Sequence, residues 1–179
     1  MVLGGGTAAA AAPAVPPGAT VIVRPATGDF DATVVQTSPL DQFPEGRNLL
    51  SGRPIYSVYL SIGAAKEWAF FYCVPDEKSQ PASGASEVKL GPLTPVRAPY
   101  PTRLVRPAIA LPSYQKYVLV HGFVNPAGRF QAMRVVGVLK PELTETLLAS
   151  LTGWEFRAAT RDGVPIAVEF LLSIPSGGL

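Results

Sequence analysis

The last third of the chain carries the pattern that most limits its fold. Two stretches rich in branched and aromatic residues, at 117–124 and 130–138, flank an Asn-Pro-Ala-Gly turn that ends at Gly128. Pro141 then suits the first position of a helix, and Gly153 suits the position after its end. Four leucines between them share one helical face: Leu143, Leu147, Leu148 and Leu151. The order expected in this part of the chain is strand, strand, helix and a last strand.

The composition supports a buried core and excludes several classes of protein. Hydrophobic residues make up 47% and charged residues 16% of the 179 residues, which suits one domain or two small ones. The 15 basic and 13 acidic residues are too balanced for a nucleic-acid-binding face. A single cysteine, Cys73, and a single histidine, His121, exclude a disulfide framework and Cys-rich or multi-histidine metal sites. No apolar run approaches the roughly 20 residues of a membrane helix.

Changes in composition divide the chain into four parts. Residues 1–18 are mostly Gly, Ala and Pro; they predict a linker or tail and lack the pattern of a signal peptide. Residues 19–74 hold strand-like segments. Residues 75–113 contain eight prolines and predict an extended connector along a surface, whose apolar residues, Val96, Leu104 and Val105 among them, are expected to pack in places. Residues 114–179 hold the hairpin and the helix, with a last strand expected at 164–174. The earlier strands are expected at 19–24, 30–37, 55–62 and 68–74.

The two ends of the chain resemble each other. The sequence GDFDATVV, which begins at Gly28, matches GRFQAMRVV, which begins at Gly128. The sequence GRPIYSVYL, which begins at Gly52, matches GVPIAVEFL, which begins at Gly163. Each unit reads strand, glycine turn, strand, connection, Gly-x-Pro and strand, so we expect two related units that pack together or continue one sheet. The alternative is that glycine-turn hairpins recur by chance.

Short motifs follow one another through the last two-fifths of the chain. They are Tyr100–Pro101, Gly128 in its turn, the valine pair Val135–Val136, the leucine-rich helix, Trp154-x-Phe156 and Gly163-x-Pro165. In this combination the segment resembles the C-terminal domain of TonB-type energy transducers, and the two-unit arrangement is similar to tandem TonB-like proteins of acidobacterial type. The family usually has proline where this chain has Ala158, and no segment here is suited to be the family's membrane anchor.

The resemblance implies a periplasmic or envelope-associated α+β protein of two TonB-like antiparallel units, the second with one packed helix, joined by the proline-rich connector. The family binds an extended segment of an outer-membrane transporter by adding it as a strand to its sheet. An edge strand can accept such a segment because its main-chain N–H and C=O groups lack partners. The residues expected to bind a partner are Ile166, Val168, Phe170 and Leu172 in the last strand, Ile55 and Tyr59 in the first unit, and Arg97, Arg103 and Arg106 in the connector.

The expected function is therefore protein binding without catalysis, in energy-coupled outer-membrane transport. The alternative is a structural or accessory subunit of a larger envelope complex that reuses the same fold. No motif indicates a cofactor, a metal, a nucleotide or nucleic acid, so other proteins are the expected partners, and an oligomer stays open.

Two pairs of motif residues are interpreted as structural. Trp154 and Phe156 alternate along an extended segment, so both are expected to point into the core against the leucines of the helix. Gly163 is interpreted as a turn residue, and Pro165 as the start of an edge strand, because proline cannot donate a ladder hydrogen bond.

The residues that could carry chemistry are also interpreted as structural. His121 shares its strand face with apolar neighbours, and Cys73 lies in an aromatic strand, so both are expected to be buried. A Cys–His nucleophile pair would need an orienting third group, which the spacing does not indicate. Glu169, on the last strand, is expected to face solvent and to discourage unwanted edge pairing.

Overall fold

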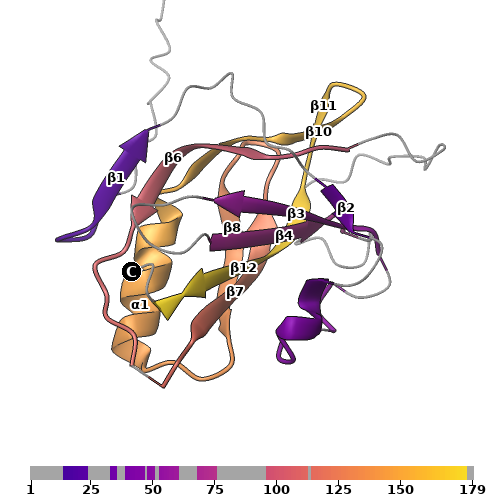
Figure 1. Ribbon diagram of the computed structural model, residues 1–179. Coiled ribbons are helices and arrows are strands. Elements are labelled where there is room, and N and C mark those ends of the chain that lie inside the picture. The colour runs from indigo at the N-terminus through magenta and orange to yellow at the C-terminus, as the bar shows by residue number, and fades with distance from the viewer. Residues whose placement is uncertain are drawn as a thin grey trace, which may run out of the picture.

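In the residues that it describes, the computed structural model is mainly antiparallel β structure with one α-helix, so the α+β expectation is confirmed (Figure 1). The structure describes residues 14–23, 33–35, 39–46, 48–50, 53–60, 68–75, 96–112 and 114–176. In chain order the elements are β1 (Thr20–Val23), β2 (Thr33–Val35), the 3-10 helix η1 (Pro39–Gln42), β3 (Ile55–Leu60), β4 (Trp68–Cys73), β5 (Val96–Arg97), β6 (Tyr100–Arg106), β7 (Tyr117–Val124), β8 (Phe130–Val136), α1 (Pro141–Thr152), β9 (Glu155–Arg157), β10 (Ala159–Arg161), β11 (Val164–Ile166) and β12 (Val168–Pro175).

The main element is a six-stranded sheet in the order β2-β3-β4-β12-β7-β8. Strand β4 pairs antiparallel with β12, from Glu169 opposite Cys73 to Ser173 opposite Ala69. This pairing joins strands of the 19–74 segment to strands of the 114–179 segment. The two parts of the chain therefore continue one sheet, which the sequence had left open.

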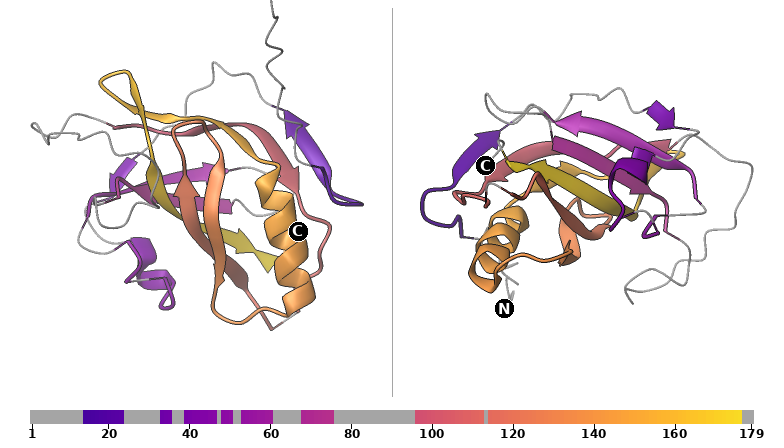
Figure 2. Two further views of the ribbon diagram at one scale, coloured as in Figure 1. Left: turned by 180° about the vertical axis from the view of Figure 1, so that it is seen from behind. Right: turned by 60° about the horizontal axis from the view of Figure 1, so that its bottom comes forward.

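Each face of this sheet has its own hydrophobic cluster, because neighbouring residues of a strand point to opposite sides. On β12, Phe170 and Leu172 belong to the larger cluster, which includes the α1 residues Leu147 and Leu151. Leu171 belongs to the smaller cluster, which the segment around η1 covers. In Figures 1 and 2, α1 and η1 lie at opposite sides of β7 and β12. With both faces covered, all six residues of β4 are buried.

A second layer is a long antiparallel ribbon, formed by residues 96–106 and 155–161. Strand β6 pairs with β9, and β5 pairs with β10. Strand β1 adds to β6 on one side, and β11 adds to β10 on the other. Leu104 and Val105 are fully buried, and Val105 O accepts a 2.9 Å hydrogen bond from Trp154 Nε1. The expectation that the connector packs in places is confirmed for 96–106, where Val96, Leu104 and Val105 belong to the large cluster. Residues 76–95 lie outside the described part.

Two expectations about strands need correction. The last strand is not continuous, because β11 pairs with β10 in the ribbon while β12 pairs with β4 and β7 in the main sheet. Strand β1 pairs with β6 and β2 pairs with β3, whereas β8 pairs with the strand just before it, β7. The two repeat units therefore pair their strands differently, although their short sequence motifs are similar.

Gly153 and Gly128 allow close approach of neighbouring segments. Gly153 follows the last residue of α1, as expected, and its φ of −77° and ψ of −4° are right-handed. A Cβ there would lie 2.7 Å from Val105 Cγ2, so glycine is required by packing against β6. Gly128 has a φ of +72° in the β7–β8 turn, as expected, and its carbonyl accepts a 2.9 Å hydrogen bond from the amide of Phe156. This turn thereby fixes β9 against the sheet.

We expect Gly128→Ala to lower the free energy of unfolding by more than about 2 kcal/mol, because it adds a collision to an unfavourable backbone angle. Its Cβ would collide with the carbonyl oxygen of Phe156. Gly163→Ala is the matched control, since Gly163 has a φ of +78° but no described atom within 4 Å of a Cβ; we expect about 1 kcal/mol there. Urea unfolding of both variants measures the difference, and equal losses would contradict the close approach at Gly128.

Candidate functional site

Strand β12 is an internal strand, so its expected role as a binding edge is wrong. Its residues pair with β4 on one side and with β7 on the other. Val168, Phe170 and Leu172 are fully buried in the large cluster. Ile166 lies on β11, where it pairs with Ala159. Since β4 supplies the partner that an incoming strand would have supplied, β12 offers no open edge over 169–173.

The first-unit residues have different environments. Ile55 was expected on an edge strand, but it is buried and pairs with Val35 of β2. Tyr59 pairs with Ala69 of β4 and is 55% exposed. It lies beyond the described pairing of β2 with β3, which covers Ile55–Ser57. A partner contact at Tyr59 stays a prediction.

The three connector arginines do not form one common binding surface. Arg103 donates a 2.8 Å hydrogen bond from Nη1 to the carbonyl oxygen of Gly153, so it holds the end of α1 to β6. Arg106 is three residues further along the same strand and therefore points to the opposite face. Arg97 lies on β5, where it pairs with Thr160. Arg103 is thus structural, and binding at Arg97 and Arg106 stays a prediction.

The motif residues behave largely as expected. Trp154 and Phe156 are buried in the large cluster, and the Trp154 ring stacks on Trp68 at a centroid distance of 5.8 Å. Gly163 forms the β10–β11 turn with a positive φ. Pro165 lies on β11, which among the described strands pairs with β10 alone, so its assignment to an edge strand is confirmed.

Glu169 is the centre of a buried charged cluster that sequence reasoning missed. It was expected to face solvent, but it is only 5% exposed. Its Oε2 accepts a 2.6 Å hydrogen bond from Arg53 Nη1, and its Oε1 lies 2.8 Å from His121 Nε2. The nitrogen of His121 that faces the carboxylate carries the hydrogen, because a carboxylate only accepts. Cys73, opposite Glu169 in register, is fully buried as expected.

This cluster fastens the segment after η1 to the sheet. Arg53 also donates from Nη2 to the carbonyl oxygen of Leu49 at 3.1 Å. Burial raises the pKa of the Glu169 carboxyl, but the hydrogen bonds from His121 and Arg53 outweigh it and hold the pKa below its ordinary value. A lone glutamate and a lone histidine within two otherwise apolar strands were the sequence signals that could have indicated this contact.

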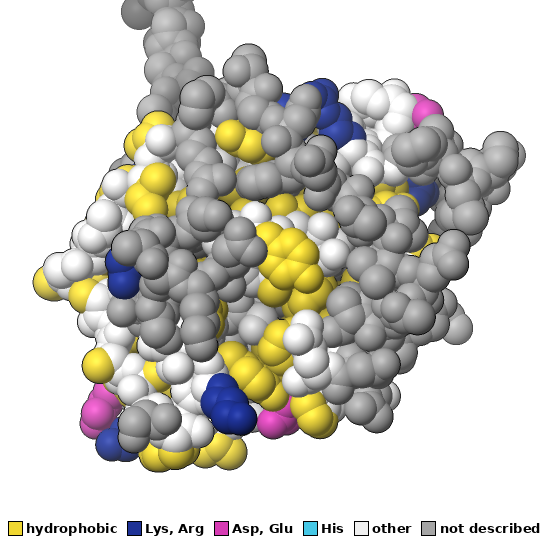
Figure 3. Space-filling model, viewed as in Figure 1, with side chains coloured by type: hydrophobic (Ala, Val, Ile, Leu, Met, Phe, Trp, Pro, Cys, Tyr) yellow, Lys and Arg dark blue, Asp and Glu magenta, His cyan; other side chains and the backbone are white. Residues whose placement is uncertain are grey.

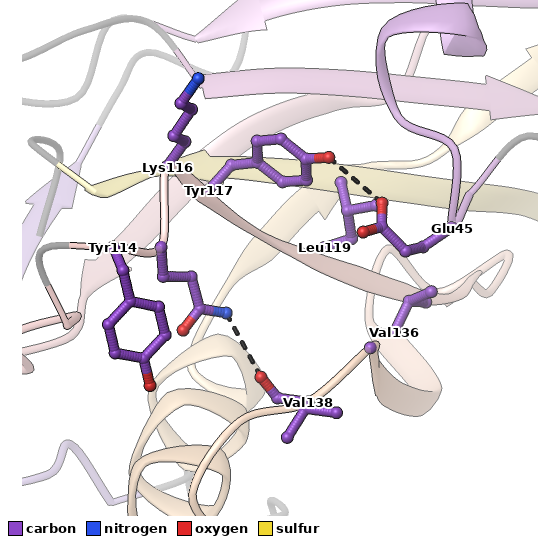
Figure 4. Close-up of a pocket in the computed structure, with 9 residues that line it drawn as sticks. Glu45, Tyr114, Lys116, Tyr117, Leu119, Val136 and Val138 are labelled. Atoms are coloured by element: carbon purple, nitrogen blue, oxygen red, sulfur yellow. Dashed lines mark hydrogen bonds between the residues drawn. The ribbon is translucent and has the colours of Figure 1, made fainter.

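An open cleft of about 510 Å³ lies between the segment after η1, the start of β7 and the end of β8 (Figure 4). Its lining residues are Glu45, Tyr114, Gln115, Lys116, Tyr117, Leu119, Val136, Gly137 and Val138. The Tyr117 hydroxyl donates a 3.1 Å hydrogen bond to Glu45 Oε2, while the Lys116 side chain extends away from that carboxylate. Burial and the neighbouring Glu45 raise the pKa of Tyr117, so its hydroxyl remains a donor.

The rim of this cleft exposes apolar surface. Val138 is 92% exposed and Tyr114 is 82% exposed. Exposed hydrophobic side chains also gather over the middle of the face in Figure 3. A concave site with apolar lining and a few polar groups is the usual form of a ligand-binding site. The cleft is therefore a candidate contact site in the described part of the chain.

The described residues contain no group of three or more His, Cys, Asp or Glu side chains that could hold a metal ion. Within the same part of the chain, no helix has the length and hydropathy needed to cross a membrane. Comparison of the chain with protein-family models, curated proteins and solved structures gives no match.

We expect Glu169→Gln to lower the free energy of unfolding by about 3 kcal/mol at pH 7, because it removes the buried carboxylate that accepts hydrogen bonds from Arg53 and His121. A carboxyl with a lowered pKa in the folded state stabilises the protein above its unfolded pKa of about 4.3. The difference between wild type and variant should therefore shrink as the pH falls below that value.

Urea unfolding at pH 7 and at pH 3 to 4 measures this effect. Glu155→Gln is the control, since Glu155 pairs with Arg129 at 3.0 Å but its side chain is 33% exposed; we expect less than about 1 kcal/mol there. A loss of stability in Glu169→Gln that is as small as in the control, or that does not change with pH, would contradict a stabilising role for the buried charged cluster.

Proposed function

We propose that this chain is a non-enzymatic, TonB-like protein-interaction module of the cell envelope, which binds an extended partner segment by adding it as a strand to β8. The partner on this proposal is a segment of an outer-membrane transporter or of another envelope protein. The single observation that carries the proposal is that β8, seven residues long, has one described neighbour, β7, and ends beside the exposed residue Val138.

The order of elements supports the TonB-like part of the proposal. Strands β12, β7 and β8 are adjacent in the sheet, and α1, which comes between β8 and β12 in the chain, contributes Leu147 and Leu151 to the core on one face. A small antiparallel sheet backed by one helix is what the motifs of the second unit imply. The binding edge implied by the same resemblance is taken by β4, so the proposal moves the edge to the other side of this three-stranded part.

The geometry of β8 supports strand addition at its second half. A bulge opposite Gly122 interrupts the pairing with β7, and Ala132 there has a φ of 51°. Beyond the bulge, Arg134, Val135 and Val136 pair regularly with β7. A regular stretch at the end of a sheet presents outward N–H and C=O groups at every second residue, which an extended peptide can satisfy.

A second candidate function is a structural or accessory subunit of a larger envelope complex. The observation that favours it is the burial of β12. In the TonB-like second unit, the edge expected to bind a partner is already paired with β4 of the same chain, so the two units form one sheet. Such a subunit would contact its partners through side chains of folded surfaces. It would not depend on the outer N–H groups of β8.

Selection from a random library of short peptides, followed by amide hydrogen exchange with a selected peptide, tests the first proposal. We expect the peptide to protect amides within Phe130–Val136 and little elsewhere, because an added strand hydrogen-bonds to the edge that it joins. Protection confined to another surface, or no selected peptide at all, would contradict strand addition at β8.

Two proline variants test the same edge independently. Successive N–H groups of a strand point to opposite sides, so one of Arg134 and Val135 directs its N–H outward. Proline at the position whose N–H points outward removes no hydrogen bond of the sheet, so we expect that variant, Arg134→Pro or Val135→Pro, to keep more of the wild-type melting temperature. The same variant should bind the selected peptide about tenfold more weakly, a loss of about 1.4 kcal/mol in binding free energy. A stable variant at each position that binds as tightly as wild type would contradict the proposal.

A further inference from the structure

We propose that the cleft beside β8 binds the side chain of a lysine or arginine in the partner segment, with its aliphatic part along the apolar floor and its cation on Glu45. This inference rests on the proposed strand addition for its occupant. The cleft was defined by its lining residues, and its volume of about 510 Å³ is ample for one long side chain.

The register of the sheet brings an added strand to this cleft. Val136 of β8 lies opposite Leu119 of β7, and both line the cleft. Side chains of paired residues in neighbouring strands point to the same face. A peptide residue placed beside Val136 would therefore direct its side chain over the same face, toward the cleft. In strand addition, main-chain hydrogen bonds give affinity and such side-chain pockets give specificity.

The charge inside the cleft favours a cation. Of the two charged side chains that line it, Glu45 has its carboxylate on the cleft side at Tyr117, whereas Lys116 extends away (Figure 4). Tyr117 hydrogen-bonds to Oε2 of Glu45, which leaves Oε1 to accept from a ligand. The Tyr117 ring is itself fixed by edge contact with Phe43, at a centroid distance of 4.9 Å. The carboxylate is thus held in position before a ligand arrives.

The rest of the cleft fits the stem of a long basic side chain. Leu119, Val136 and Val138 supply apolar surface, and Tyr114 lies at the end away from Glu45 (Figure 4). Lysine and arginine combine an apolar stem with a terminal charge, so they can cover apolar surface and reach a carboxylate together. A glutamate or aspartate would meet the charge of Glu45, and a short apolar side chain would leave that charge uncompensated.

Titration of the full chain with N-acetyl-lysine N-methylamide, followed by amide chemical shifts, tests the cleft directly. We expect shifts at Leu119, Val136 and Gly137, and at least tenfold weaker binding of the uncharged analogue N-acetyl-norleucine N-methylamide. Glu45→Gln should weaken the lysine analogue by about tenfold. Asp162→Asn, which removes the same charge from the β10–β11 turn, should leave it unchanged.

Equal binding of the two analogues, or unchanged binding by Glu45→Gln, would overturn the inference. The peptide library separates this from the proposed function. Peptides that protect β8 and are enriched in Lys or Arg at one position for wild type, but not for Glu45→Gln, support both proposals. Peptides that protect the amides of β8 equally in wild type and in Glu45→Gln, with no position enriched in Lys or Arg, overturn the inference about the cleft but are consistent with strand addition at β8. A library that yields no β8 binder overturns strand addition, and with it the peptide as the occupant.

Discussion

The pairing of β4 with β12 is the contact on which the rest of the structure depends. It joins the strands before residue 75 to the strands after residue 113 in one sheet, through five residue pairs. Because this pairing places β4 inside the sheet, its aromatic residues need cover on both faces, and all six residues of the strand are buried. One face receives α1 and the β6–β9 ribbon, and the other receives the segment around η1. Without the pairing, neither layer would have a complete surface on which to pack.

The two faces of β12 contribute to the fold in different ways. On one face, aromatic packing such as the stack of Trp68 on Trp154 buries large apolar areas, which supplies stability with little directional preference. On the other face, Glu169 needs both Arg53 and His121 to compensate its burial. A slip of β12 by one residue would turn Glu169 into the aromatic cluster, where it has no such partners. The charged cluster around Glu169 therefore selects the register of β12, while the large cluster contributes apolar burial to the free energy of folding.

Local patterns predicted the elements well, but they could not predict the order of the strands. The hairpin around Gly128, the helix from Pro141 and the burial of Trp154 each follow from residues close in sequence, and each was found. The position of β12 depends on β4, about 100 residues earlier, and no local pattern carries that pairing. The same reason explains the cleft, because Glu45 reaches Tyr117 only after the segment around η1 has packed on the sheet. The interior position of Glu169 likewise needed partners from two other segments.

The filled edge at β12 has a consequence for how this protein can recognise a partner. A sheet can accept a strand only where main-chain groups remain open, and in the six-stranded sheet the end strand that the second unit contributes is β8. An edge interrupted by a bulge, as β8 is at Ala132, pairs poorly with an arbitrary strand, because only the stretch beyond the bulge is regular. Such a short stretch provides few hydrogen bonds, so discrimination between partners needs side-chain contacts as well. A cleft at the end of that same stretch, with one oriented carboxylate and an apolar floor, supplies contacts of this kind where the main chain alone would bind weakly.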